Sequence, residues 1–258
     1  AYFEIDCTCD SNLTAEDRDF RLTRKVDQHP FVPPMSVRDE SCGEIFSIQV
    51  GGIAKRWQHT QSEHLIIGIS GGLDSTLALL VCVKTADKLG YDRKRIIGVT
   101  MPGFGTTDRT YNNAVELMKA LGISIREINI KEACLLHFRD IGHDPEVHDV
   151  TYENVQARER TQILMDLANK HNGLVVGTGD LSESALGWST YNGDHMSMYG
   201  VNSGVPKTLV RYLVGWAAHQ LDEQSEKILT DILDTPVSPE LLPFDEKGEI
   251  AQKTEDIV

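Results

Sequence analysis

The feature that most constrains the fold is a glycine-rich loop placed between a short apolar run and a longer stretch with apolar residues at helical spacing. The loop covers residues 68–76 and reads GISGGLDST. The apolar run 65–69 precedes it, and a run this short that ends in glycines is typical of a buried parallel strand. Residues 75–89 are expected to form the helix that follows, with Gly90 as its stop signal. This order favours an α/β fold that binds an anion where the loop meets the helix N-terminus.

The same alternation of strand and helix continues along the chain. Strands are expected at 65–69, 95–100, 123–130 and 174–177, and helices at 46–57, 75–89, 107–121, 152–169, 206–222 and 226–233. Helices of this length between strands predict right-handed crossovers and a parallel sheet flanked by helices on both faces, as in a Rossmann-like fold. Ligands of such sheets bind beyond the carboxyl ends of the strands. The loops after residues 69, 100, 130 and 177 are therefore the places to look for a site.

Composition excludes several classes of function. A formal net charge of -14 argues against a nucleic-acid partner, because phosphate binding needs a basic surface, although a local pocket can still hold a small anion. The apolar run 77–83 is too short to span a bilayer. Five scattered cysteines without a CxxC pair indicate reduced thiols in a cytoplasmic protein.

The glycine loop differs from the two common nucleotide-binding loops. It lacks the lysine of the Walker A motif, and it lacks the GxGxxG pattern of dinucleotide-binding folds. Its SGGxDS pattern matches the pyrophosphatase loop of enzymes that cleave ATP between the α and β phosphates. Asp74 would carry a Mg²⁺ ion that bridges the phosphates. The alternative is a glycine-rich turn that Asp74 merely caps.

A second group of small residues and carboxylates follows the last expected strand. Residues 177–184 read GTGDLSES. In a parallel sheet, Thr178 and Glu183 would lie on the same rim as Asp74, so a carboxylate from each loop could hold Mg²⁺. The alternative is a capping arrangement in which Ser182 starts a helix that ends at Leu186.

Three longer runs carry a resemblance to a known family. They are MPGFGTTDRTYNNA from Met101, HFRDIGHDPEVHDVTYENVQARERTQILMD from His137, and GTGDLSESALGWSTYNGDHMSMYGVNSGVPKTLVRYLV from Gly177. Together they resemble the synthetase part of glutamine-dependent NAD synthetases over nearly the whole chain. GMP synthetases, asparagine synthetases and tRNA thiolases share the SGGxDS loop but not these later runs, and a tRNA thiolase is further disfavoured by the acidic charge.

The resemblance implies a carbon–nitrogen ligase of NAD biosynthesis, with ATP as a substrate and Mg²⁺ as the metal. The carboxylate of deamido-NAD would attack the α-phosphate of ATP and release pyrophosphate. Ammonia would then attack the adenylated nicotinate, form NAD and release AMP. Ammonia would be the nitrogen source for this chain, and glutamine the source in the full-length enzyme.

The resemblance also assigns residues to roles. Asp74, Glu183 and Lys207 would be catalytic, and Asp74 and Glu183 would bind the metal. The ATP-binding set would be Gly68, Ile69, Ser70, Gly71, Gly72, Leu73, Asp74, Ser75, Thr178, Lys207 and Ser238. The deamido-NAD-binding set would be Asn154, Arg158, Glu183, Trp188, Ser189, Thr190, Tyr191 and Asp194.

Two questions stay open at the level of sequence. Trp188 and Tyr191 fit either a ring-stacking role against nicotinate or a place in the core. Either Asp180 or Asp194 could accept the proton that ammonia loses when it attacks.

The resemblance further implies a domain organisation. Residues 1–41 would be a linker that follows an amidase domain, and residues 42–258 would be the amidating domain, ending before the last helical part of the family. The family also leads us to expect a homo-oligomer. A competing interpretation is a nucleotide-binding regulatory domain without catalysis, although the presence of both Asp74 and Glu183 favours an enzyme. His137, His143 and His148 match no common zinc spacing and are expected in a solvated loop.

Overall fold

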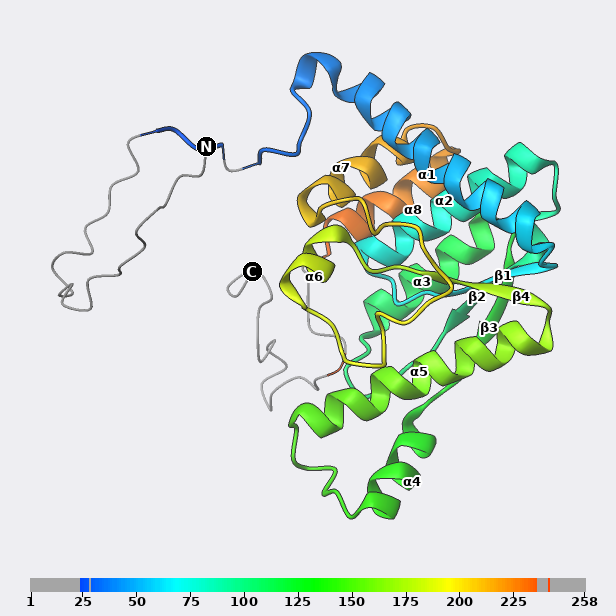
Figure 1. Ribbon diagram of the computed structural model, residues 1–258, viewed down its shortest axis with the longest axis vertical. Coiled ribbons are helices and arrows are strands. Elements are labelled where there is room, and N and C mark those ends of the chain that lie inside the picture. The colour runs from blue at the N-terminus through cyan, green and yellow to red at the C-terminus, as the bar shows by residue number, and fades with distance from the viewer. Residues whose placement is uncertain (1–23, 28, 236–240, 242–258) are drawn as a thin grey trace, which may run out of the picture. The chain divides into compact units, whose positions relative to one another are not determined.

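The computed structural model describes residues 24–27, 29–235 and 241 (Figure 1). The fold belongs to the unit that starts at Phe31. Among the described residues, its centre is one parallel sheet of five strands with the order β3-β2-β1-β4-β5. The strands are β1 (His64–Gly68), β2 (Ile96–Thr100), β3 (Ser124–Glu127), β4 (Gly173–Gly177) and β5 (Tyr199–Gly200). The predicted α/β fold with a parallel sheet is confirmed.

Helices cover both faces of this sheet (Figure 1). One face carries α1 (Arg38–Thr60), α2 (Leu73–Leu89), α3 (Asp108–Ala120), α7 (Lys207–Ala218) and α8 (Glu223–Leu233). The other face carries α4 (Lys131–Ile141) and α5 (Val150–Lys170). Short helical segments at Met35–Val37, Arg93–Arg95 and α6 (Leu181–Leu186) lie in the connections.

Successive side chains of the central strands point to opposite faces of the sheet, which explains why helices must cover both faces. In β1, Leu65 and Ile67 pack into the core under α2, whereas Ile66 between them packs against the side of α5. All three are fully buried. A strand that is apolar on both faces is stable only inside a three-layer fold, because either face left in water would lose the free energy of apolar burial.

Four sequence expectations about the elements are wrong. β3 is shorter than the expected strand 123–130, and the short strand β5 was not expected. Helix α1 begins at Arg38, before the periodic pattern at 46 and within the stretch expected to be a linker. Helix α4 was not expected at all, although Cys134 and Phe138, four residues apart, are its buried residues.

The solvated loop expected around the three histidines is also wrong in part. His137 lies within α4. The side chain of His143 is only 13% exposed and its ring lies 5.2 Å from that of Phe138. Asp149, in the same segment, caps α5 by accepting the amide hydrogens of Thr151 and Tyr152. The segment therefore has a structural role at the junction of α4 and α5.

The described part of the chain contains no helix with the length and apolar character needed to cross a bilayer. Cys42, Cys82 and Cys134 are free and buried, as expected for reduced thiols. Cys7 and Cys9 lie outside the described residues.

Candidate active site

The order of the strands in the sheet is enough to locate the candidate site. From β1 the chain moves outward to β2 and β3, then returns to the other side of β1 to form β4 and β5. The carboxyl ends of β1 and β4 are therefore the point where the order reverses, and their following loops part in opposite directions. A crevice at such a switch point is where open parallel sheets bind ligands. The two loops singled out by sequence, after residues 68 and 177, are the two that meet there.

The glycine loop is held in shape by its own hydroxyl groups. Gly72 donates its amide hydrogen to Ser70 Oγ at 3.2 Å, and Ser75 Oγ donates to the carbonyl oxygen of Gly72 at 3.0 Å. Ser70 Oγ and Ser75 Oγ also lie 3.2 Å apart. Gly72 is the N-cap of α2, so Asp74 stands in the first helical turn, where the amides and the helix dipole favour an anion.

Gly71 occupies the position in this loop that tolerates no side chain. Its φ is +90°, and a Cβ atom there would overlap the carbonyl group of Thr110. If the loop binds phosphates as the sequence predicts, Gly71→Ala should weaken binding of an ATP analogue at least about tenfold, because the strained loop would displace its amides.

Isothermal titration of the folded variant with α,β-methylene-ATP measures this effect. Gly90→Ala is the matched control, because Gly90 also has a positive φ, of +66°, at the other end of α2, but a Cβ there would meet no atom within 4 Å. Equal losses of affinity in the two variants would contradict the specific role of Gly71.

The loop after β4 turns directly into α6 through a capping box. Asp180 Oδ1 accepts the amide hydrogen of Glu183 at 2.9 Å, and Glu183 Oε2 accepts that of Asp180 at 3.0 Å. The expected alternative of a capping arrangement is therefore present, and the helix ends at Leu186 as expected, but the N-cap is Asp180 and not Ser182. Ser182 Oγ instead accepts the amide hydrogen of Lys207 at 3.0 Å, which ties α6 to the start of α7.

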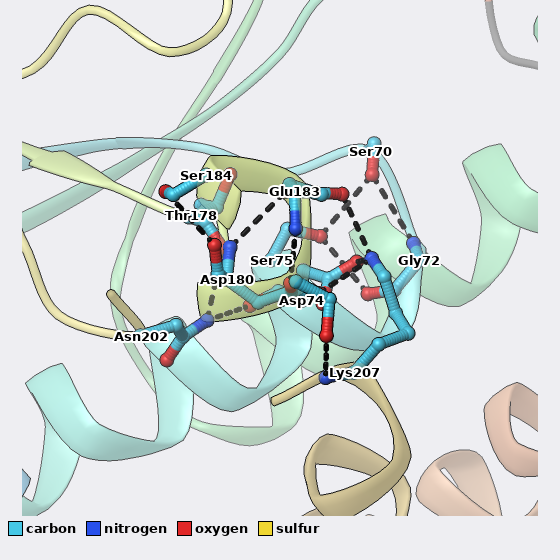
Figure 2. Close-up of polar contacts among 11 residues, drawn as sticks. Ser70, Gly72, Asp74, Ser75, Thr178, Asp180, Glu183, Ser184, Asn202 and Lys207 are labelled. Atoms are coloured by element: carbon cyan, nitrogen blue, oxygen red, sulfur yellow. Dashed lines mark hydrogen bonds and ion pairs between the residues drawn. The ribbon is translucent and has the colours of Figure 1, made fainter. Parts of the chain in front are cut away.

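Lys207 joins the two loops at the centre of the site (Figure 2). Its Nζ atom lies 2.8 Å from Asp74 Oδ2, 2.8 Å from Glu183 Oε1 and 2.8 Å from Asp180 Oδ2. The first carboxylate comes from the loop after β1 and the other two from the loop after β4. Asp74 and Glu183 thus lie on one rim, as expected from the sequence, and the structure brings Lys207 to the same place.

This cluster carries an excess of negative charge. Three carboxylates face one ammonium group, so the approach of a polyphosphate is unfavourable without further cations. Asp74 Oδ1 is buried and, among the described residues, has no hydrogen-bond partner. One oxygen from each carboxylate lies within 4.8 Å of those from the other two, and no other such group of three metal-ligating side chains occurs in the described part of the chain. Carboxylate oxygens with phosphates as further ligands suit Mg²⁺, so these residues fit the expected metal.

Burial changes the acidity of the cluster. Burial, together with the neighbouring Glu183 and Asp180, raises the pKa of Asp74 from 3.8 to about 6, against the opposing effect of Lys207. Burial disfavours the charge on Lys207, but the carboxylates around it outweigh burial and hold its pKa above the ordinary value.

A pH dependence follows for metal binding. Asp74 is protonated below about pH 6 and then offers no charge to a cation, so we expect Mn²⁺ binding to the nucleotide-free protein to weaken as the pH falls through this value. Electron paramagnetic resonance of free Mn²⁺ between about pH 5 and about pH 8 measures the dependence. Asp74→Asn should lack this step, and a wild-type affinity that stays constant down to about pH 5 would contradict the assignment.

Apart from Glu183, the residues assigned to deamido-NAD lie on α5 and on the loop that follows α6. Arg158 of α5 donates from Nε and Nη2 to the carbonyl oxygen of Tyr191, at 3.2 and 3.1 Å, and so holds the loop 187–195. Asp194 Oδ1 accepts the amide hydrogen of Thr190 at 2.7 Å within this loop. Trp188 and Tyr191 are 46% and 73% exposed, which excludes the core as their place.

The remaining predicted residues have simpler outcomes. Asn154 lies on α5, one turn before Arg158. Ser189 and Thr190 belong to the exposed loop that Arg158 holds, and the carbonyl oxygen of Thr178 accepts a hydrogen bond from Asn202. Ser238 lies outside the described residues.

Sequence reasoning missed two residues of the site. Asp180 was considered only as a proton acceptor, yet it is the third carboxylate around Lys207. Its capping spacing with Glu183 was a usable signal, since a capping box fixes both side chains in one turn. Asn202 was not considered, and its local sequence gives no signal for its contacts with Asp74 and Thr178, which are described below.

Comparison with known proteins gives a consistent result. The family model described as NAD synthase matches residues 46–243. The chain is 48% identical over 242 residues to the glutamine-dependent NAD(+) synthetase of Mycobacterium leprae, covering 91% of this chain and 35% of that protein. It is 32% identical over 219 residues to the protein of the same name from Thermotoga maritima, covering 83% and 36%. The chain thus spans about a third of the length of these curated relatives.

Solved structures share the fold. The glutamine-dependent NAD+ synthetase of Acinetobacter baumannii, in complex with ADP, has a TM-score of 0.67 at 28% identity, covering 73% of this chain and 36% of that one. The NMN synthetase of Francisella tularensis has the same TM-score at 24% identity, covering 80% of each chain, and supports the fold alone. With the family model matching most of its length, the chain belongs to the NAD synthase family.

Proposed function

We propose that this chain catalyses the ATP-dependent amidation of deamido-NAD to NAD, with release of pyrophosphate and AMP. The observation that carries the proposal is the position of Lys207, 2.8 Å from carboxylates of both loops directly beyond the glycine loop. A cation-binding rim beside a helix N-terminus suits a substrate with several phosphates. Membership of the NAD synthase family supplies the substrate class.

In the first step, two anions must meet. A carboxylate oxygen of the nicotinate ring forms a bond to the α-phosphorus of ATP, and the bond from that phosphorus to the bridging oxygen breaks, so that pyrophosphate leaves. The nicotinate carboxylate is already ionised at neutral pH, so no general base is needed. The glycine loop and the start of α2 would bind the leaving phosphates, and Lys207 would exchange its carboxylate contacts for a phosphate oxygen.

A bound Mg²⁺ would neutralise charge on the phosphates during this step. Asp74 and Glu183 would hold it, as the resemblance implies, with Asp180 close by. Asp180 is fully buried, and its two oxygens contact the amide of Glu183 and the ammonium of Lys207. We therefore assign Asp180 the task of holding the Lys207 side chain in reach of both loops.

In the second step, ammonia forms a bond to the activated carbonyl carbon, the carbon–oxygen bond to AMP breaks, and the new amide loses one proton. Because Asp180 is occupied, Asp194 is the better candidate to accept this proton. Its loop also presents Trp188 and Tyr191, whose exposed rings suit stacking against nicotinate. Asp194→Asn should shift the pH profile of ammonia-dependent turnover, and an unchanged profile would remove Asp194 from this role.

The wider organisation is part of the same proposal. An amidase domain that supplies ammonia from glutamine, joined to the amidating domain through the residues that precede α1, would account for the greater length of the curated relatives.

One assay tests the reaction. The full chain is mixed with ATP, Mg²⁺, deamido-NAD and ammonium, and NAD, AMP and pyrophosphate are measured together. Equal amounts of the three products support the proposal. Pyrophosphate without NAD restricts the activity to adenylation, and no product in the presence of measurable ATP binding favours a regulatory domain instead.

A further inference from the structure

The two loops of the site are joined by one buried side chain that no motif predicted. Asn202 is fully buried and follows β5. Its Nδ2 donates to the carbonyl oxygen of Asp74 at 2.9 Å and to that of Thr178 at 3.0 Å (Figure 2). A single amide nitrogen therefore bridges the loop after β1 and the loop after β4.

This bridge lies where the sheet no longer holds the loops together. The pairing of β1 with β4 runs to Ile67 and Val176, and beyond it the chain turns in opposite directions. Past that pair, the two loops are connected through Lys207 and through Asn202. If Lys207 leaves its carboxylates to contact a phosphate, as the proposed function requires, the Asn202 bridge is what continues to fix the distance between the loops.

The chemistry of the bridge requires an asparagine. Two carbonyl oxygens need two hydrogens from one short side chain, which serine and aspartate cannot supply. The remaining oxygen, Asn202 Oδ1, accepts a hydrogen bond from Gln49 Nε2 at 3.1 Å. Gln49 lies on α1, is itself buried, and also donates to the carbonyl oxygen of Val201 at 3.0 Å. Gln49 thereby fixes the orientation in which the Asn202 amide faces the two loops.

The two bonded carbonyls belong to the machinery of the site. One is the main-chain carbonyl of Asp74, whose carboxylate contacts Lys207. The other belongs to Thr178, two residues before Asp180 and at the start of the turn that leads to Glu183. A shift of either carbonyl moves a carboxylate of the cluster relative to the others.

We propose that Asn202 is a positioning residue that sets the separation of Asp74 from Asp180 and Glu183, and with it the affinity of the site for the metal–nucleotide complex. The inference rests on the proposed function for its consequence in catalysis, but its consequence for metal binding is independent of turnover. A displacement of about 1 Å in a catalytic group can cost about a hundredfold in rate.

The test compares Asn202→Asp with the wild type in the full chain. Aspartate keeps the shape and the acceptor for Gln49 but loses both hydrogens to the loops. We expect kcat for pyrophosphate release to fall about ten- to a hundredfold. We expect binding of Mn²⁺ in the presence of α,β-methylene-ATP to weaken about tenfold, while KM for ammonium stays within about twofold.

A matched control separates positioning from general stability. Ser225 is also fully buried, and its Oγ donates to Asp222 Oδ2 at 2.9 Å in the cap of α8, away from the site. Ser225→Ala should lower Tm but leave Mn²⁺ affinity and kcat per folded molecule unchanged. Gln49→Leu should act in the same direction as Asn202→Asp but more weakly, because it removes the support of Asn202 without touching Asp74 or Thr178.

The outcomes test the role of Asn202 and the proposed function separately. Wild-type kcat and Mn²⁺ affinity in folded Asn202→Asp would overturn the inference and leave the proposed function intact, as would equal losses in Ser225→Ala. If Asn202→Asp does not fold, Gln49→Leu decides, and wild-type values for it overturn the inference. If the wild type releases no pyrophosphate, the proposed function fails, and the Mn²⁺ measurement alone decides the role of Asn202.

Discussion

Replacing Asp74 by asparagine should lower the rate of pyrophosphate release by about a thousandfold or more. The carboxylate stands in the first turn of α2, contacts Lys207, and has one buried oxygen without a hydrogen-bond partner among the described residues. Asparagine keeps the shape but removes the charge that a metal needs. Metal neutralisation of transferring phosphates contributes several kcal/mol, and each factor of ten in rate corresponds to about 1.4 kcal/mol.

The measurement is the initial rate of pyrophosphate release at saturating ATP and deamido-NAD. Asp87→Asn is the matched control, because Asp87 lies near the other end of the same helix and pairs with Arg93 at the surface. This control should keep the wild-type rate. A loss of less than about tenfold in Asp74→Asn would show that the metal does not depend on this carboxylate.

Replacement of Lys207 should have two opposite effects, one on the reaction rate and one on metal binding. Replacing Lys207 by methionine should lower the rate of pyrophosphate release about a hundredfold to a thousandfold, because the proposed mechanism assigns the charge of this lysine to the phosphates. The same change should tighten the binding of Mn²⁺ to the nucleotide-free protein. The ammonium group of Lys207 lies 2.8 Å from all three carboxylates, so a metal must compete with it for the same oxygens.

Removal of Lys207 leaves three carboxylates without a counter-charge, which strengthens their attraction for a free cation. The exposed Lys84 of α2 provides the control, and Lys84→Met should change neither quantity. A weaker Mn²⁺ affinity in Lys207→Met would mean that the lysine supports the metal site by its packing instead of competing for it. Circular dichroism of both variants checks that the fold is retained.

Much of the fold is encoded in short apolar runs, which is why the sequence was sufficient to predict it. Residues 65–69 and 174–177 are apolar on both faces, and only strands covered by helices on both sides satisfy that pattern. Helix α4 escaped prediction because Leu135 and Leu136 are 44% and 48% exposed. Apolar residues on its outer face blurred the periodicity that Cys134 and Phe138 otherwise carry.

The residues of the site could be predicted where the groups that act together are close in sequence. The loop 68–76 contains its own glycines, hydroxyls and carboxylate, so Asp74 could be named from its neighbours alone. The roles of Asp180 and Asn202 depend on the approach of segments distant in sequence. Asp180 contacts Lys207 where α6 packs beside the start of α7, and Asn202 reaches Asp74 across 128 positions. Contacts between such distant segments cannot be predicted from a local sequence pattern.

The long sequence separation of the site residues also bears on the stage of folding at which the cation site forms. Lys207 and Asp74 are separated by 133 positions, and the strands that bring their loops together, β1 and β4, have α2, β2, α3, β3, α4 and α5 between them in the chain. Closing loops of that length costs chain entropy before any contact offsets it, so we expect these pairings to form late. A partly folded chain has scattered carboxylates and no shared site. We therefore expect Mn²⁺ to bind and stabilise the completed fold and not the unfolded chain, so that the recovery of Mn²⁺ affinity during refolding should report the last step of assembly.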